Sequence, residues 1–191
     1  MLGLSRWSLL KGLVAILCIF GIVSLALIYF IPAPPSKITI ATSFKGGHYV
    51  DLFSRYQEIL ARSHLKVEQR LTKGAAENLK LLNDPASGIQ IGFMQGGISD
   101  SKQSPDLLSL GRIDYQLFWL FHRATETLDD LTQLKGKRIA LGSIGSGSRA
   151  VTEKILGIGG INHDNTTLLT LAGQDAVNAL NDGKIDAFFR L

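Results

Sequence analysis

The sequence KITIATSFKGGHYVDLFSRY, residues 37–56, decides the fold, because its apolar residues change their period across one glycine turn. Ile38 and Ile40 alternate with their neighbours, which is typical of a strand. The apolar residues after Asp51 recur at helical spacing and predict a helix over residues 51–62. A strand, a glycine turn and a helix in this order form the first half of a parallel βαβ unit.

The same alternation of strands and helices continues along the chain. It favours a parallel α/β sheet over an antiparallel sandwich. The pattern restarts after Phe121, so we predict two α/β lobes, residues 38–122 and residues 123–191. Further strands are predicted at 65–71, 89–94, 115–121, 138–142 and 185–191, helices at 75–82, 148–158 and 174–182, and a short helix or loop at 128–134.

The second lobe is predicted to be incomplete. Its last strand, 185–191, ends without a flanking turn or a further helix, and about 69 residues are few for a stable unit. We therefore expect Phe188 and Phe189 to lack a later element that covers them. We also expect the second lobe to be the less ordered one, and this chain to bind its ligand poorly.

An apolar stretch precedes the lobes. Residues 12–31 carry no charge, and a helix of that length spans about 30 Å, the hydrocarbon thickness of a bilayer. A secretory signal peptide is the competing interpretation, but its apolar core runs for only about 7–15 residues before a small-residue cleavage site. Here the stretch is longer and ends in bulky residues such as Tyr29 and Phe30. The sequence predicts an uncleaved transmembrane anchor.

The flanks of this stretch predict its orientation. Arg6 and Lys11 lie on its N-terminal side, which keeps residues 1–11 in the cytoplasm. Residues 32–37 are a stiff, proline-rich spacer. We expect a single-pass protein of a bacterial inner membrane, held in the lipid bilayer by residues 12–31, with its soluble domain in the periplasm or outside the cell.

Composition excludes several function classes. The net charge of +4 is mild and spread along the chain, and the run Lys135–Arg138 is more simply a turn before a strand than a nucleic-acid patch. One cysteine, Cys18, permits neither an intramolecular disulfide nor a cysteine metal cluster. The four histidines lack the spacing of metal ligands. We expect no metal, no cofactor and no nucleic-acid partner.

Three glycine turns follow predicted strands, at residues 43–49, 95–97 and 142–149. In open α/β sheets ligands bind beyond the carboxyl ends of strands, where helix N-termini favour an anion. One such turn alone is more often only a tight connection, whereas three after strands leave an anion site and simple tight connections as equal alternatives. Arg149 either pairs with a ligand carboxylate or points to solvent. Ser148 is interpreted as a helix N-cap.

The order ITIATSFKGGHY, IGFMQGG, LKGKRIALGSIGSGSRAVTEKIL and DGKIDAFF resembles the substrate receptors of TRAP transporters of the TAXI family, over about residues 37–190. The resemblance implies a type II periplasmic-binding-protein-like fold that clamps a small organic anion, such as a dicarboxylate or glutamate, between its lobes. It also implies the membrane subunits of a TRAP-type transporter as partners. The matched motifs place these residues around the cleft: Ser43, Gly46, Gly47, Tyr49, Gln95, Gly96, Gly145, Ser146, Ser148 and Gln174. His48, Gly147 and Arg149 lie in the same turns and complete the expected ligand-binding set.

Two departures from the family pattern stand out. Its receptors are usually secreted, whereas this chain is predicted to be tethered, and its usual GSGT sequence is GSGS here. The favoured function is ligand capture for transport, without catalysis and without catalytic residues. The alternatives are a tethered sensor that signals through a partner, or an enzyme on the same fold. The scarcity of clustered cysteine, histidine and acidic residues argues against the enzyme.

Overall fold

The computed structural model describes residues 6–30, 35, 37–63, 65–123 and 127–191, and it divides into two compact units, residues 1–36 and 37–191. The first unit contains helix α1 (Arg6–Phe30), which begins before the predicted span of 12–31. Its segment Leu10–Phe30 is long and apolar enough to cross a bilayer. A helix that is apolar on all sides needs a protein core or a membrane around it, and this segment is not buried in the protein.

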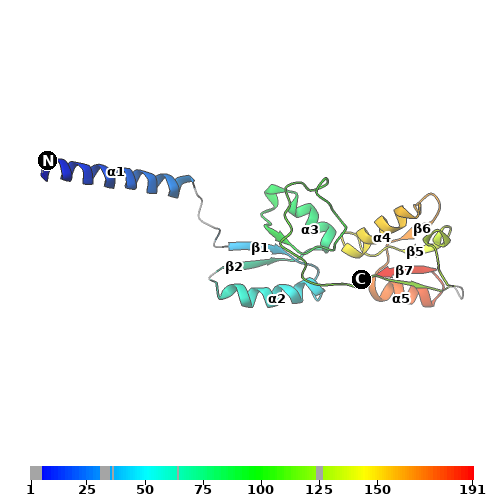
Figure 1. Ribbon diagram of the computed structural model, residues 1–191. Helices are drawn as coiled ribbons and strands as arrows, with labels where there is room; N and C mark the ends of the chain where they lie inside the picture. Colours follow the sequence, from blue (N-terminus) through cyan, green and yellow to red (C-terminus); the bar gives the residue numbers. More distant parts are fainter. Residues whose placement is uncertain (1–5, 31–34, 36, 64, 124–126) are drawn as a thin grey trace. The chain divides into compact units, whose positions relative to one another are not determined.

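The first sheet of the second unit is wholly parallel. Its strands are β1 (Lys37–Ala41), β2 (Lys66–Arg70) and β3 (Ile91–Gly92), in the order β2-β1-β3. Helices α2 (His48–Ala61) and α3 (Ala75–Leu82) cover its two faces, and the 3-10 helix η1 (Pro85–Ser87) follows (Figure 1). Because β1 lies in the centre, the chain passes from β1 to β2 on one side of it and then crosses to β3 on the other side. A crevice forms at such a point, outside the carboxyl ends of the strands.

The core of this sheet joins strands and helices of distant sequence. Ile40 and Val67 on the strands pack with Tyr49 and Phe53 of α2 and with Phe93, and all five side chains are buried. Tyr49 stacks on Phe93 with ring centroids 5.4 Å apart. Burying each large apolar side chain is worth about 1.5–3 kcal/mol, which holds α2 against the sheet.

The second sheet repeats this winding and adds one strand. Its strands are β4 (Trp119–His122), β5 (Arg138–Ala140), β6 (Thr167–Leu169) and β7 (Ala187–Arg190), in the order β4-β7-β5-β6. Strand β5 lies between β6 and β7, parallel to both, as β1 lies between β2 and β3. Helices α4 (Gly147–Ile158) and α5 (Gly173–Asn181) cover its faces, and the 3-10 helix η2 (Leu131–Leu134) precedes β5 (Figure 1).

The structure confirms the α/β class and corrects several details. Strand β4 pairs antiparallel with β7, although the alternation predicted parallel strands. Strand β6 was not predicted. The expectation that Phe188 and Phe189 lack a cover was wrong, because β4 and its flank supply one: Phe121 stacks on Phe188 at 4.9 Å and Phe118 on Phe189 at 5.2 Å between ring centroids. Both C-terminal phenylalanines are buried.

Candidate functional site

The first glycine turn lies between β1 and the N-terminus of α2. Gly46 has a φ of +82°, a left-handed conformation that favours glycine. Gly47 is the N-cap of α2 and supplies no side-chain hydrogen bond to the first turn of that helix. The free N–H groups of a helix start attract anions. The turn therefore offers main-chain donors without a capping side chain of its own.

Ser43 lies against this helix start. Its side chain is buried, and its Oγ has no hydrogen-bond partner in the structure. A Cβ at Gly47 would overlap this Oγ, so glycine is required for the close approach. Buried hydroxyl groups almost always have a partner, and an orphan one needs an explanation such as a ligand. Ser43 thus presents an unused hydroxyl to the N-terminus of α2.

Asn78 holds the loops around this turn together. The side chain is fully buried in α3, and its Nδ2 donates to the carbonyl oxygens of Thr42 at 2.7 Å and Phe93 at 2.8 Å. Its Oδ1 lies 2.7 Å from Oγ1 of Thr72. These three partners belong to the loops after β1, β3 and β2, respectively. One carboxamide therefore joins all three carboxyl ends of the first sheet.

The second glycine turn, after β3, meets the start of α4. Oε1 of Gln95 is buried without a hydrogen-bond partner, and a Cβ at Gly147 would overlap it. Nε2 of Gln95 donates to Oε1 of Gln116 over 3.3 Å. Gly147 is the first residue of α4. A carboxamide oxygen of the first lobe is thus seated against the N-terminal turn of a second-lobe helix.

The third glycine turn, after β5, ends in the N-cap of α4. That cap is Ser146, whose Oγ accepts from the main-chain N–H of Arg149 over 3.2 Å. The interpretation of Ser148 as N-cap was wrong because the helix begins one residue earlier, at Gly147. Arg149 donates to Glu153 and to Thr170, each over 2.8 Å, so its guanidinium is engaged within its own lobe.

The two lobes touch along this line of turns. The N–H of Glu77 donates to the carbonyl oxygen of Gly145 over 3.3 Å. A Cβ at Gly145 would lie 2.9 Å from Cβ of Lys73, and Nζ of Lys154 donates to the carbonyl oxygen of Gly97 over 2.6 Å. The loops after β2 and β3 and the start of α3 therefore face α4 and the turn before it across a narrow contact.

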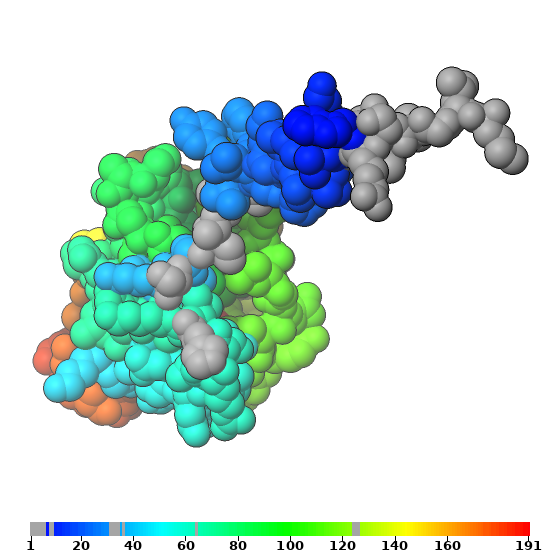
Figure 2. All heavy atoms as spheres, turned by 90° about the vertical axis from the view of Figure 1, so that its left-hand side faces the viewer, coloured from blue at the N-terminus to red at the C-terminus, as the bar shows by residue number. Residues whose placement is uncertain are grey.

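His48 and Tyr49 have separate surroundings at the start of α2. Nε2 of His48 lies 2.8 Å from Oδ2 of Asp114, in the segment between β3 and β4. Figure 2 shows this segment beside α2 (cyan). Burial, with a smaller contribution from the Asp114 charge, raises the pKa of Tyr49, so its phenol stays neutral. The N–H of Tyr115 and the His48 side chain lower the pKa of Asp114.

The expected site residues are brought together only in part. Ser43 meets Gly47, and Gln95 meets Gly147. Gln174 is exposed and donates to Asn178 on its own helix. Asn78, Asp114 and Lys154 were not predicted from the sequence. The available signal for Asn78 was an asparagine among the apolar residues of a short helix. Of the remaining predicted residues, Gly46 and Gly96 lie in the turns, whereas Ser148 is the second residue of α4.

The polar groups at this site are suited to binding a ligand. Main-chain N–H groups at the start of α2 and the unused hydroxyl of Ser43 suit an oxyanion. Within the described ranges, no group of three or more histidine, cysteine or acidic side chains is placed to hold a metal ion. The arrangement can recognise a small acid group by hydrogen bonds alone.

Comparisons with known proteins agree with this architecture. Residues 40–191 match the model of the NMT1-like family. No curated protein matches the sequence. The periplasmic aliphatic sulphonate binding protein SsuA from Escherichia coli is similar in structure, with a TM-score of 0.53 and 20% identity over 82% of this chain and 54% of that chain. The alkanesulfonate-binding protein SsuA from Xanthomonas axonopodis pv. citri has a TM-score of 0.49 and 22% identity over 82% of this chain and 55% of that chain.

These comparisons bear on the fold. The likeness to the Escherichia coli protein shows the α/β fold of periplasmic binding proteins, as the sequence predicted. The chain spans 54% of the length of the Escherichia coli protein.

Proposed function

The chain belongs to the NMT1-like family, and on that premise we propose that it is an extracytoplasmic solute-binding protein. Its ligand is a small organic anion, held where the glycine turns after β1, β3 and β5 converge. The function is capture for transport, and it requires no bond to be made or broken. The fold of periplasmic binding proteins supports this proposal.

One observation carries the proposal. The Oγ of Ser43 is buried and unpartnered beside Gly47, the uncapped start of α2. A structural serine at this position would normally cap the helix or bond to a nearby carbonyl. An acid oxygen placed between the hydroxyl and the free N–H groups would satisfy both.

The chemistry of the helix start sets the ligand class. A carboxylate or sulphonate oxygen accepts several hydrogen bonds and is favoured by the positive end of the helix dipole. The Escherichia coli relative is named for aliphatic sulphonates, whereas the motif resemblance favours a dicarboxylate or an amino acid such as glutamate. We propose a carboxylate as the primary ligand, delivered to the membrane subunits of a TRAP-type transporter of the TAXI kind.

The anchor belongs to the same proposal. Segment Leu10–Phe30 is uncharged except for Lys11 and long enough to span a bilayer. We propose that it remains on the mature protein as a single inner-membrane span, with residues 37–191 in the periplasm. Tethering would keep the receptor near its transporter, in contrast to a freely diffusing one.

Calorimetry on the full chain in detergent micelles tests the proposal. Succinate, glutamate and ethanesulphonate are titrated into the wild type and into Ser43→Ala. We expect one of these acids to bind and Ser43→Ala to weaken that binding about tenfold or more, since a hydrogen bond to a charged group is worth about 1.5–3 kcal/mol.

Stability supplies the second readout. Because the Ser43 hydroxyl has no hydrogen-bond partner within the protein, Ser43→Ala should unfold no earlier than the wild type. Ser54→Ala is the matched control: this exposed serine of α2 donates only to the carbonyl oxygen of Val50, and its loss should leave affinity unchanged. Equal affinity of wild type and Ser43→Ala would place the ligand elsewhere.

A further inference from the structure

A pocket lies at the end of the second sheet that is opposite to the glycine turns. It has a volume of about 220 Å³, and its lining includes His122, the last residue of β4, and Lys137 and Asp186, which immediately precede β5 and β7. The pocket lies at the amino end of strand β5, whereas the third glycine turn lies at the carboxyl end of the same strand. The pocket is therefore distinct from the proposed cleft.

Hydrogen-bond donors dominate this pocket. Nδ1 of His122 is buried and has no partner in the structure. Oε1 of Gln133 accepts from the N–H groups of Asp129 and Asp130, each over 2.9 Å, so its amide nitrogen remains as a donor. Among the residues described, none forms a hydrogen bond or ion pair with Nζ of Lys137. The residues that line the pocket thus include an imidazole, a carboxamide and an ammonium group.

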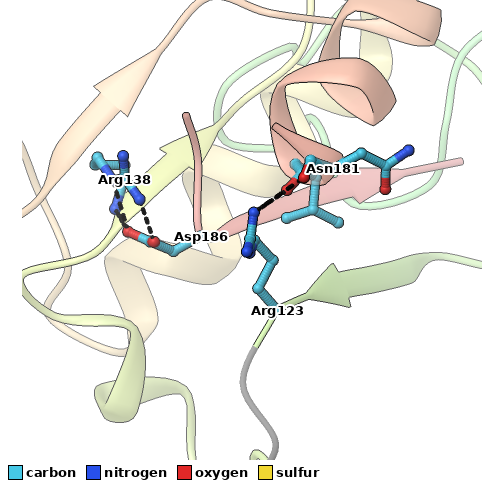
Figure 3. Close-up of polar contacts among 5 residues, drawn as sticks. Arg123, Arg138, Asn181 and Asp186 are labelled. Carbon is cyan, nitrogen blue, oxygen red and sulfur yellow. Dashed lines mark hydrogen bonds and ion pairs between the residues drawn. The ribbon is translucent and has the colours of Figure 1, made fainter. Parts of the chain in front are cut away.

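The acidic residue of the pocket is already engaged. Oδ1 of Asp186 accepts from Nη2 of Arg138 over 2.6 Å, and Oδ2 accepts from Nε and the main-chain N–H of Arg138 over 3.0 and 2.8 Å (Figure 3). Nη1 of the neighbouring Arg123 donates to the carbonyl oxygens of Leu180 and Asn181 (Figure 3). Both carboxylate oxygens are occupied, and the charge of Asp186 is balanced by Arg138.

We propose that this pocket binds a small aliphatic carboxylate. Its acid group would accept from His122, Gln133 and Lys137, which satisfies the orphan nitrogen of His122. Leu128 and Leu134 also line the pocket and offer apolar surface to a short hydrocarbon chain. The volume suits a ligand of a few heavy atoms.

Nuclear magnetic resonance of the full chain in detergent micelles tests this site. The histidine rings are labelled with carbon-13, and the signals of His122 and His48 are assigned from His122→Gln and His48→Gln. Butyrate and formate are the probes. We expect a saturable shift of the His122 signal, at lower concentration for butyrate because its chain reaches Leu128 and Leu134.

Two variants decide where the acid binds. Lys137→Ala should weaken the response of His122 to butyrate about tenfold, as expected for one charge-assisted hydrogen bond. Lys184→Ala is the control, because this lysine is exposed in the same lobe and pairs with Asp182; it should change nothing. A His122 signal that fails to saturate, a response confined to His48, or unchanged binding in Lys137→Ala would each overturn the proposal.

Discussion

The side-chain amide of Asn78 donates a 2.7 Å hydrogen bond to the carbonyl oxygen of Thr42 and thereby ties helix α3 to the loop that follows β1. The same nitrogen reaches Phe93, and the oxygen meets Thr72. Both polar atoms of this carboxamide form hydrogen bonds, and the side chain is fully buried. The loops of the proposed cleft therefore depend on one side chain outside it.

Asn78→Ala should lower the free energy of unfolding by about 3 kcal/mol, because it removes a fully buried carboxamide and takes from the carbonyl oxygen of Phe93 its side-chain donor. Thermal and chemical unfolding of the full chain in micelles would measure the loss. Asn178→Ala is the control, since Asn178 is exposed and accepts only from Gln174. Similar losses in both variants would show that the network contributes little.

The contact between Gln95 and Gly147 predicts a steric coupling across the lobes. Gly147→Ala should destabilise the protein and disturb the cleft, because the new Cβ overlaps Oε1 of Gln95. Gln95→Ala should itself cost little, because Oε1 has no partner and Nε2 loses only an exposed 3.3 Å hydrogen bond to Gln116. The double variant should regain most of the loss. A double-mutant cycle on unfolding temperatures checks this, and strictly additive effects would contradict it.

The Arg138–Asp186 pair predicts a pH dependence of stability (Figure 3). The side-chain hydrogen bond from Arg138 is the largest cause that lowers the pKa of Asp186 in the folded protein. The unfolded chain then binds a proton more readily, with an ordinary pKa of about 3.9. The stabilisation is fully present above that value and is lost as the pH falls through the lower pKa of the folded protein.

Asp186→Asn should therefore melt at a lower temperature than the wild type at pH 7, and the difference should shrink at acid pH, below about 4. Calorimetric melts at several pH values would show this. Asp182→Asn, which removes an exposed partner of Lys184, should give a smaller and flatter difference. A gap between wild type and Asp186→Asn that stays constant down to acid pH would argue against the pair.

The proposed anchor predicts how the chain is processed and held. The purified protein should keep its first residues, so that N-terminal sequencing does not begin near residue 33 or 36. Ile19→Lys should weaken membrane integration, because a lysine at the centre of a span costs about 2.5–3.5 kcal/mol. Extraction at alkaline pH measures the integrated fraction, with Ile19→Leu as the control. Release of the wild type by this treatment would count against the anchor.

Local sequence was sufficient for much of the secondary structure. Helix α3 has the bounds that its apolar spacing predicted, 75–82. Helix α2 starts at His48, directly after Gly47 and three residues before the predicted start. The membrane-length apolar helix and the turns after β1, β3 and β5 were also predicted, since long apolar runs and glycines after strands act within a few residues.

The binding details could not be predicted in the same way. Whether Ser43 caps a helix or stays unpartnered depends on how closely Gly47 approaches it. The partner of His48 is Asp114, 66 residues away. Arg149 is held by Glu153 one turn away and by Thr170, which lies 21 residues further on. Only the first of these Arg149 contacts follows from helical spacing.

By itself the sequence determined the membrane-length helix, the α/β class and the repeated strand–glycine–helix units, because these depend on periodicity and on turn residues that are neighbours in the chain. Tertiary structure alone decided the antiparallel pairing of β4 with β7, which buries Phe188 and Phe189, and the meeting of Gln95 with Gly147. Those contacts join residues more than fifty positions apart. Their energy comes from burial and steric fit, which exist only after both lobes have folded.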